Sequence, residues 1–181
     1  MEEQMEIEEL KEAPNLGSEP KSESSLVRDF TIAAGQDAPD VPTKVMTKEQ
    51  INFICKMIID EMLELCATAY TPSESKEMFK DLITNAKEVP FNGDQGLLET
   101  IGEQHDAFVD IIYYIQNCAV KNGVNLSKLF KVVHEANMNK KDPKTGLFLK
   151  REDGKIIKPE GWKAPDITEE IRKQVLDGAW N

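Results

Sequence analysis

The chain has 181 residues, which is enough for one domain with its own core and a tail. Its net charge of −11 argues against binding to nucleic acid or to an anionic membrane, because few cations are available to neutralise phosphates. No apolar run reaches the roughly 18–20 residues of a membrane span, and the acidic N-terminus lacks the apolar segment of a secretory signal. We therefore expect a cytoplasmic protein that binds neither nucleic acid nor membrane.

The three cysteines, Cys55, Cys66 and Cys118, are odd in number and show no CxxC spacing. Each lies among apolar residues with helical periodicity. We interpret them as reduced core thiols of an intracellular protein, without a metal or a disulfide.

The first 24 residues predict a disordered acidic tail. Residues 1–23 hold eight Glu and two Lys and few large apolar side chains, so burial cannot offset the entropy lost on ordering. Residues 25–35 predict a short helix that ends at Gly35. Pro39 and Pro42 then predict an extended linker over 38–42, because each proline disfavours helix in the residue before it.

Three helices are predicted in the middle of the chain. Thr47 and Gln50 form a capping-box pattern that opens a helix over 47–70. This helix is apolar nearly all round, which predicts burial. A weaker helix follows over 74–89 and stops at Pro90, and Asn92-Gly93 predicts a turn. The third helix, over 94–122, closes at Gly123 and has one apolar stripe: Leu98, Ile101, Phe108, Ile111, Ile112, Ile115 and Ala119.

The C-terminal third predicts one helix from Asn125 to about Met138 or Lys140. Asp153-Gly154 between two apolar runs is a hairpin signal over 146–158. Residues 167–180 predict a terminal helix. The expected fold is therefore all-α, a bundle of four to five helices with a small C-terminal β-hairpin.

Two groups of acids lie on separate predicted helices. Asp60, Glu61 and Glu64 span about 100° of the first long helix, and Glu103, Asp106 and Asp110 lie within about 60° on the second. Like charges at this spacing repel unless they are solvated, protonated or bridged by cations. Mg²⁺ prefers carboxylate and water oxygens and also takes substrate phosphates, so a divalent-cation site is one interpretation.

A solvated acidic face is the alternative interpretation, and for the helix over 94–122 it stays equally open. The acids of the helix over 47–70 are poor candidates for such a face, because apolar residues share their arc. His105 lies about 100° from Asp106, which is more typical of a solvent-facing or core-edge histidine than of a ligand. Lys140 and Lys141 are either partners of the helix dipole or phosphate ligands, and Lys140 shares a helical face with Asn137.

Other chemistries lack their signatures. No Ser or Cys lies in a nucleophile-elbow context, and neither a Walker A sequence nor GxGxxG is present. The Glu-x-x-His pairs of di-iron carboxylate bundles are also missing.

The ordered motifs resemble the MazG-like all-α NTP pyrophosphohydrolases, in the branch similar to phosphoribosyl-ATP pyrophosphohydrolase. Asp60-Glu61-x-x-Glu64 resembles the family motif Glu-Glu-x-x-Glu, and Glu103-x-x-Asp106 resembles Glu-x-x-Asp. Further similar segments follow the family order: residues 27–30, 106–110, 134–140 and 151–155. The resemblance covers about residues 25–167 and makes this a single helical domain, with residues 168–181 as an extension.

The resemblance implies an enzyme that cleaves a (d)NTP or related nucleotide between the α and β phosphates. Its metal would be Mg²⁺, or alternatively Mn²⁺. Glu61, Glu64, Glu103 and Asp106 would hold metal and carry catalysis. Asp60 would be a further metal ligand, and Asp110, Asn137 and Lys140 would bind the substrate. It also implies a homo-oligomer, a dimer or a dimer of dimers.

Two departures from the family pattern limit this transfer. Asp60 stands where the family usually has Glu, and the segment from Pro72 to Gly93 is longer than expected. Two other functions stay open: a non-catalytic helical dimer that acts as a nucleotide- or protein-binding scaffold, and a plain helical interaction protein with solvated acidic faces.

Overall fold

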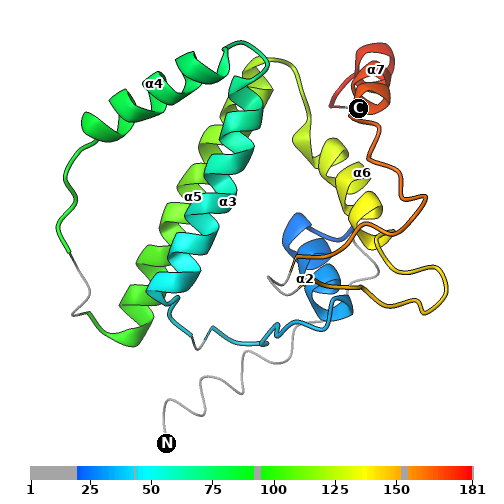
Figure 1. The fold of residues 1–181 in the computed structure, drawn as a ribbon, viewed down its shortest axis with the longest axis horizontal. Coiled ribbons are helices and arrows are strands. Elements are labelled where there is room, and N and C mark those ends of the chain that lie inside the picture. Colours follow the sequence, from blue (N-terminus) through cyan, green and yellow to red (C-terminus); the bar gives the residue numbers. More distant parts are fainter. Residues whose placement is uncertain (1–19, 43, 92–94, 152–154, 181) are drawn as a thin grey trace, which may run out of the picture. The chain divides into compact units, whose positions relative to one another are not determined.

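The computed structural model describes residues 20–42, 44–91, 95–151 and 155–180. Within these ranges the chain forms six helices, which confirms the all-α class (Figure 1). They are α2 (Glu23–Ala33), α3 (Lys48–Cys66), α4 (Pro72–Thr84), α5 (Leu97–Lys121), α6 (Leu126–Met138) and α7 (Ile167–Asp177).

The helix starts follow from local capping chemistry. At α3 the Thr47 hydroxyl accepts from the Gln50 backbone N–H, and the Gln50 side chain accepts from the Thr47 N–H, so the predicted capping box is confirmed. Thr71 and Glu74 form a second capping box at α4, which begins at Pro72 and ends at Thr84 rather than at 89. Proline fits there because the first helical N–H needs no partner within the helix.

Two glycines lie just after the ends of α2 and α5, as predicted. Gly35 and Gly123 have φ of +66° and +75°, a left-handed conformation that disfavours side chains. The predicted turn at Asn92-Gly93 lies outside the described residues.

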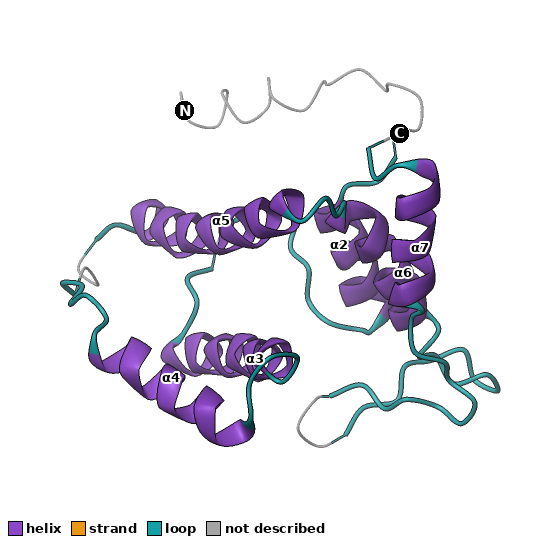
Figure 2. Ribbon diagram, turned by 90° about the horizontal axis from the view of Figure 1, so that it is seen from above, coloured by secondary structure: helices purple, strands orange, loops and turns teal. Residues whose placement is uncertain are grey.

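The predicted C-terminal hairpin is wrong. Residues 146–158 contribute only to two isolated antiparallel bridges, Lys141 with Phe148 and Lys150 with Ile156, and no strand occurs in the described ranges (Figure 2). The Asp153-Gly154 signal itself lies outside those ranges. Leu147 is 65% exposed and Leu149 44%, so this segment lacks the buried apolar face that a two-stranded ribbon needs for stability.

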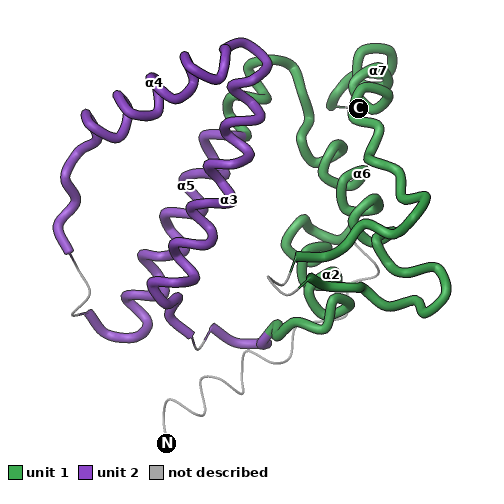
Figure 3. The backbone as a smooth tube through the Cα atoms, in the orientation of Figure 1, with its two compact units in different colours: residues 1–38, 116–181 green, residues 39–115 purple. Residues whose placement is uncertain are grey.

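The chain divides into two compact units, which Figure 3 colours separately. Unit 1 comprises residues up to 38 and from 116 onward, and in it α6 packs against both α2 and α7. The C-terminal helix is fastened by Gln174, whose amide accepts from the Asn125 N–H at 2.9 Å and donates to the Asn125 carbonyl at 3.1 Å. Phe30 also meets Phe148 edge to face, with ring centroids 5.2 Å apart.

Unit 2 comprises residues 39–115, with α3, α4 and most of α5. Gln104 on α5 fixes the backbone of Met46, just before α3 begins. Its amide accepts from the Met46 N–H at 2.9 Å and donates to the Met46 carbonyl at 3.3 Å. Beyond that point, α3 and α5 overlap in Figure 1, but Figure 2 shows them apart.

The predicted burial of α3 is wrong for the single chain. None of its residues is buried, and Phe53 and Leu65 are 60% and 69% exposed. Cys55 and Cys118 are likewise exposed, so they are not core thiols, although all three cysteines are free of disulfides. The physical reason is the same in both cases, since these faces of α3 and α5 are not covered by another segment of the chain among the described residues.

Several predictions fall partly outside the described ranges. The predicted tail is described only from residue 20, and α2 begins at Glu23. The boundaries of the predicted domain at 25–167 and of the extension at 168–181 stay predictions. Among the described helices, none has the length and apolar character that a membrane crossing requires.

Candidate functional site

The first acidic group lies on the exposed surface of α3. Asp60, Glu61 and Glu64 are all exposed, so in the single chain they form the solvated face that the sequence had disfavoured. The Asp60 carboxylate accepts from the Lys56 ammonium at 2.6 Å, one helical turn away. An exposed pair of this kind contributes only about 0.5 kcal/mol, so it leaves Asp60 available to a cation.

The second acidic group lies on α5 and is equally accessible. Glu103 accepts from the Gln95 amide at 2.9 Å, and Asp106 and Asp110 are exposed. Of the apolar stripe predicted opposite them, Ile101 is buried, whereas Leu98 and Ile112 are 69% and 57% exposed.

The two groups do not converge within one chain. Among the described residues, no three Asp, Glu, His or Cys side chains lie close enough together to hold a metal ion. The donor chemistry nevertheless suits a hard divalent cation, because all six predicted side chains offer carboxylate oxygens. The single chain thus has suitable ligand groups, but it does not bring the acids of α3 close to those of α5.

His105 is engaged with its own helix. Its Nδ1 lies 2.7 Å from the Ile101 carbonyl oxygen, and its ring meets Phe108 edge to face at 5.9 Å. Because a carbonyl can only accept, this contact places the proton on Nδ1. This arrangement agrees with the interpretation of His105 as a solvent-facing side chain rather than a ligand.

Asn137 and Lys140 meet in unit 1, on the shared face that their spacing predicted. The Lys140 ammonium donates to the Asn137 side-chain oxygen at 2.7 Å. It also lies 5.4 Å from the centroid of the Trp162 ring. Burial, followed by the charges of Lys158 and Lys155, lowers the pKa of Lys140 below its usual value.

Trp162 and Lys158 escaped the sequence-based prediction of the site. The Trp162 indole N–H donates to the Ala136 carbonyl at 2.7 Å, which fixes the ring against α6, and the Lys158 ammonium lies 4.6 Å from its centroid. The signal was present as a tryptophan between lysines at 158 and 163. Periodicity does not reveal it, because the segment is irregular.

Comparisons with known proteins add an independent line of support. The family model of phosphoribosyl-ATP pyrophosphohydrolase matches residues 27–137, more than half of the chain. The fold is similar to the crystal structure of a candidate NTP pyrophosphohydrolase from Exiguobacterium sp. 255-15, with a TM-score of 0.74 and 25% sequence identity over 89% of this chain and 100% of that one. A search of curated proteins gives no match. The chain therefore belongs to the phosphoribosyl-ATP pyrophosphohydrolase family.

Proposed function

We propose that this protein hydrolyses a nucleoside triphosphate, or a related nucleotide, between its α and β phosphates with the help of Mg²⁺ or Mn²⁺. The observation that carries the proposal is the family match over residues 27–137, because this range holds both acidic motifs in the family order. Asn137 closes the matched range, and Lys140 lies three residues beyond it.

Each predicted residue has a role in this proposal. Glu61 and Glu64 of α3 would hold the metal together with Glu103 and Asp106 of α5, and Asp60 would add a further carboxylate. At these carboxylates Mg²⁺ would supply positive charge to neutralise the phosphates and would lower the pKa of a bound water. Asp110 orients the substrate for attack by water, the α–β phosphoanhydride bond breaks, and a monophosphate and pyrophosphate are released.

Asn137 and Lys140 bind the phosphates or the sugar. An amide and an ammonium are suited to this role, because both donate hydrogen bonds to phosphate oxygens. The contact between the two side chains supports the assignment, because it holds the Lys140 ammonium in place before a substrate arrives.

We also propose a homodimer, or a dimer of dimers, as the working form. Large apolar side chains of α3 and α5 are exposed in the single chain, including Phe53, Leu65, Ile112 and Tyr114. Pairing with a second copy would remove them from water and hold α3 close to α5. The acids of the two helices would then share one cation site.

The free cysteines support a cytoplasmic location as part of this proposal. Cys55, Cys66 and Cys118 form no disulfide with one another. Unpaired thiols are typical of proteins kept in a reducing compartment, where nucleoside triphosphates are also found.

The test is pyrophosphate release from a panel of dNTPs and NTPs with Mg²⁺, compared between the full chain and two variants. Glu61→Gln and Asp106→Asn remove one carboxylate from each motif, and we expect each to lower kcat at least a hundredfold. Glu77→Gln removes an exposed carboxylate of α4 outside both motifs and should leave the rate unchanged.

Two outcomes would contradict the proposal. If Glu61→Gln and Asp106→Asn keep the activity, the site is elsewhere. If the unmodified protein releases no pyrophosphate from any substrate, yet a non-hydrolysable nucleotide raises its melting temperature, it is a nucleotide-binding scaffold instead.

A further inference from the structure

A basic segment follows α6 in a chain that is otherwise acidic. Residues 139–163 carry eight Lys or Arg and four Asp or Glu, whereas the whole chain has a net charge of −11. The segment lies in unit 1 and outside the range matched by the family model. A local excess of cations of this kind attracts anions even when the net charge of the protein is negative.

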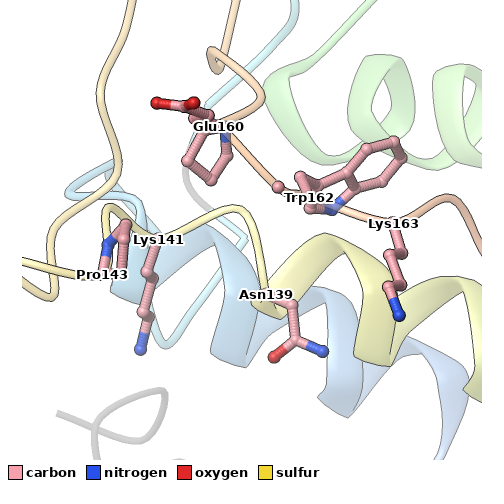
Figure 4. Close-up of a pocket in the computed structure, with 8 residues that line it drawn as sticks. Asn139, Lys141, Pro143, Glu160, Trp162 and Lys163 are labelled. Carbon is pink, nitrogen blue, oxygen red and sulfur yellow. The ribbon is translucent and has the colours of Figure 1, made fainter.

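The segment forms a pocket of about 330 Å³. Its polar lining comes from the amide of Asn139, the ammonium groups of Lys141 and Lys163, and the carboxylate of Glu160. Figure 4 shows the Lys141, Asn139 and Lys163 side chains pointing to the same side, whereas the Glu160 carboxylate points away from them. The polar side-chain groups that point to this side are two ammonium groups and one amide.

Trp162 lines the pocket and contacts two further cations that lie beside it, outside its lining. Its indole is anchored to Ala136, and the ammonium groups of Lys140 and Lys158 lie 5.4 Å and 4.6 Å from its ring centroid. The aromatic ring attracts each of them, but it cannot cancel the repulsion between the two positive charges.

Two lysines line the pocket, Lys141 and Lys163, and two more lie beside it at Trp162; none of the four has an acidic partner among the described residues. Within the described part of the chain, no carboxylate lies at ion-pair distance from the ammonium groups of Lys140, Lys141, Lys158 and Lys163. The lowered pKa of Lys140 reflects part of the resulting electrostatic cost. An anion in the pocket would contact Lys141 and Lys163 directly, and its charge would also reduce the repulsion at Lys140 and Lys158.

We propose that this pocket binds a polyphosphate, either the phosphate chain of a nucleotide or inorganic pyrophosphate. Lysine is a common phosphate ligand, and four lysines suit a ligand with several negative charges better than a single carboxylate. A pocket near 300 Å³ is small among ligand sites, which fits a phosphate chain without its base. The choice of polyphosphate over other anions rests on the proposed function.

The experiment uses the fluorescence of Trp162. The chain has two tryptophans, so Trp180→Phe in the full-length protein leaves Trp162 as the only source of indole emission. Pyrophosphate and a non-hydrolysable nucleoside triphosphate are titrated separately, in EDTA so that the acidic residues have no metal. We expect each to change the emission with saturation, and the apparent Kd to rise with salt.

Lys163→Gln and Lys141→Gln, each in the Trp180→Phe protein, test the pocket itself. Each removes one charge-assisted hydrogen bond, so we expect the Kd for pyrophosphate to rise between tenfold and a hundredfold. Lys121→Gln is the matched control, because Lys121 is an exposed lysine at the end of α5, outside the pocket. It should change the Kd less than twofold.

Two results would overturn the proposal: no saturable change in emission with either pyrophosphate or the nucleotide, or equal weakening by Lys121→Gln and Lys163→Gln. These results are independent of turnover, because binding is measured without metal and without hydrolysis. An inactive protein that still binds pyrophosphate in this pocket would contradict the proposed function and support this inference.

Discussion

Unit 1 and unit 2 contain similar helix caps and hydrogen bonds, but they differ in how their helices pack and in which side chains are buried. In unit 1, α6 packs against α2 and α7, and Ala34, Ala136, Ala179 and Gln174 are buried. In unit 2, the buried side chains are Ile101 and Ser75, and the faces of α3 and α5 carry exposed Phe, Tyr, Ile and Leu. Both units leave apolar side chains in water, among them Val175 and Leu176 of α7 in unit 1, but the larger exposed apolar faces are those of α3 and α5 in unit 2.

One motif occurs in both units and makes the contrast sharper. A glutamine amide clamps the backbone N–H and carbonyl of a distant residue, Gln174 on Asn125 in unit 1 and Gln104 on Met46 in unit 2. Gln174 is buried, whereas Gln104 is half-buried. The hydrogen bonds are half-buried in both clamps, but the glutamine that makes them is buried in unit 1 and half-buried in unit 2.

The largest effect is expected on the exposed face of unit 2. Ile112 on α5 is 57% exposed in the single chain, and in the proposed homo-oligomer it is buried. Ile112→Glu then loses about 2 kcal/mol of apolar burial in each copy and adds an unpaired charge, so the dissociation constant should rise more than a hundredfold. Sedimentation velocity across a concentration series measures this change.

Val175→Glu is the control for that experiment. Val175 on α7 is 77% exposed and belongs to unit 1. If the copies pair through α3 and α5 and not through α7, the substitution leaves the assembly unchanged. A monomeric unmodified protein, or equal dissociation by both variants, would refute the difference between the units.

A smaller effect is expected at the two glutamine clamps. Gln174→Ala removes two hydrogen bonds from a buried position, which should lower the free energy of unfolding by about 2–3 kcal/mol. Gln104→Ala removes the equivalent pair where water can replace it, so about 1 kcal/mol is expected. Urea unfolding followed by circular dichroism measures both.

Gln36→Ala, at an exposed glutamine after α2, provides the baseline and should stay within about 0.5 kcal/mol of the unmodified protein. Equal losses at positions 174 and 104 would mean that the clamp of unit 2 is as well shielded as that of unit 1. That result would point to a partner covering Gln104.

The smallest expected effect concerns the pH dependence of stability, and it distinguishes the capping box of α4 from that of α3 in unit 2. Glu74 accepts from the N–H and the hydroxyl of Thr71, and these hydrogen bonds lower the pKa of its carboxyl. A carboxyl with a lowered pKa stabilises the fold above its ordinary pKa, and this contribution is lost as the pH falls through the lowered value. Glu74→Gln should therefore flatten the fall of the melting temperature between about pH 5 and pH 3.

Glu77→Gln on the same helix removes an acid outside the capping box and tests the assignment. A pH profile that changes as much in this variant as in Glu74→Gln would show that general charge repulsion, not the cap, sets the acid stability. The α3 cap offers an internal comparison, because Gln50 makes the equivalent contact without a titrating group.

The sequence predicted the helices well because the signals that start and stop them are local. Thr47 with Gln50, Asn125, Gly35 and Gly123 act within about four residues of their own position, so a linear pattern contains the whole interaction. The order of the acidic motifs is also a linear property, and it led to the family that the comparison confirms.

The predictions that failed concerned burial and pairing. The helix over 47–70 was expected to be buried because it is apolar nearly all round, yet α3 has no buried residue in the single chain. The hairpin at 146–158 was expected from its turn sequence, yet no ribbon forms over its described residues, and Leu147 and Leu149 stay exposed. The apolar character of a helix face predicts that another segment covers it, but the pattern does not identify that segment.

The sequence by itself determined which segments form helices and where several of them are capped, which carboxylates share a helix face, and the family to which the chain belongs. Only the tertiary structure decided that Lys140 and Lys158 meet at Trp162, that Gln174 fastens α7 to the start of α6, and that α3 stays apart from α5. The physical reason is range: caps and helix faces depend on neighbours within one or two turns, whereas burial and charge clusters depend on which distant segments meet.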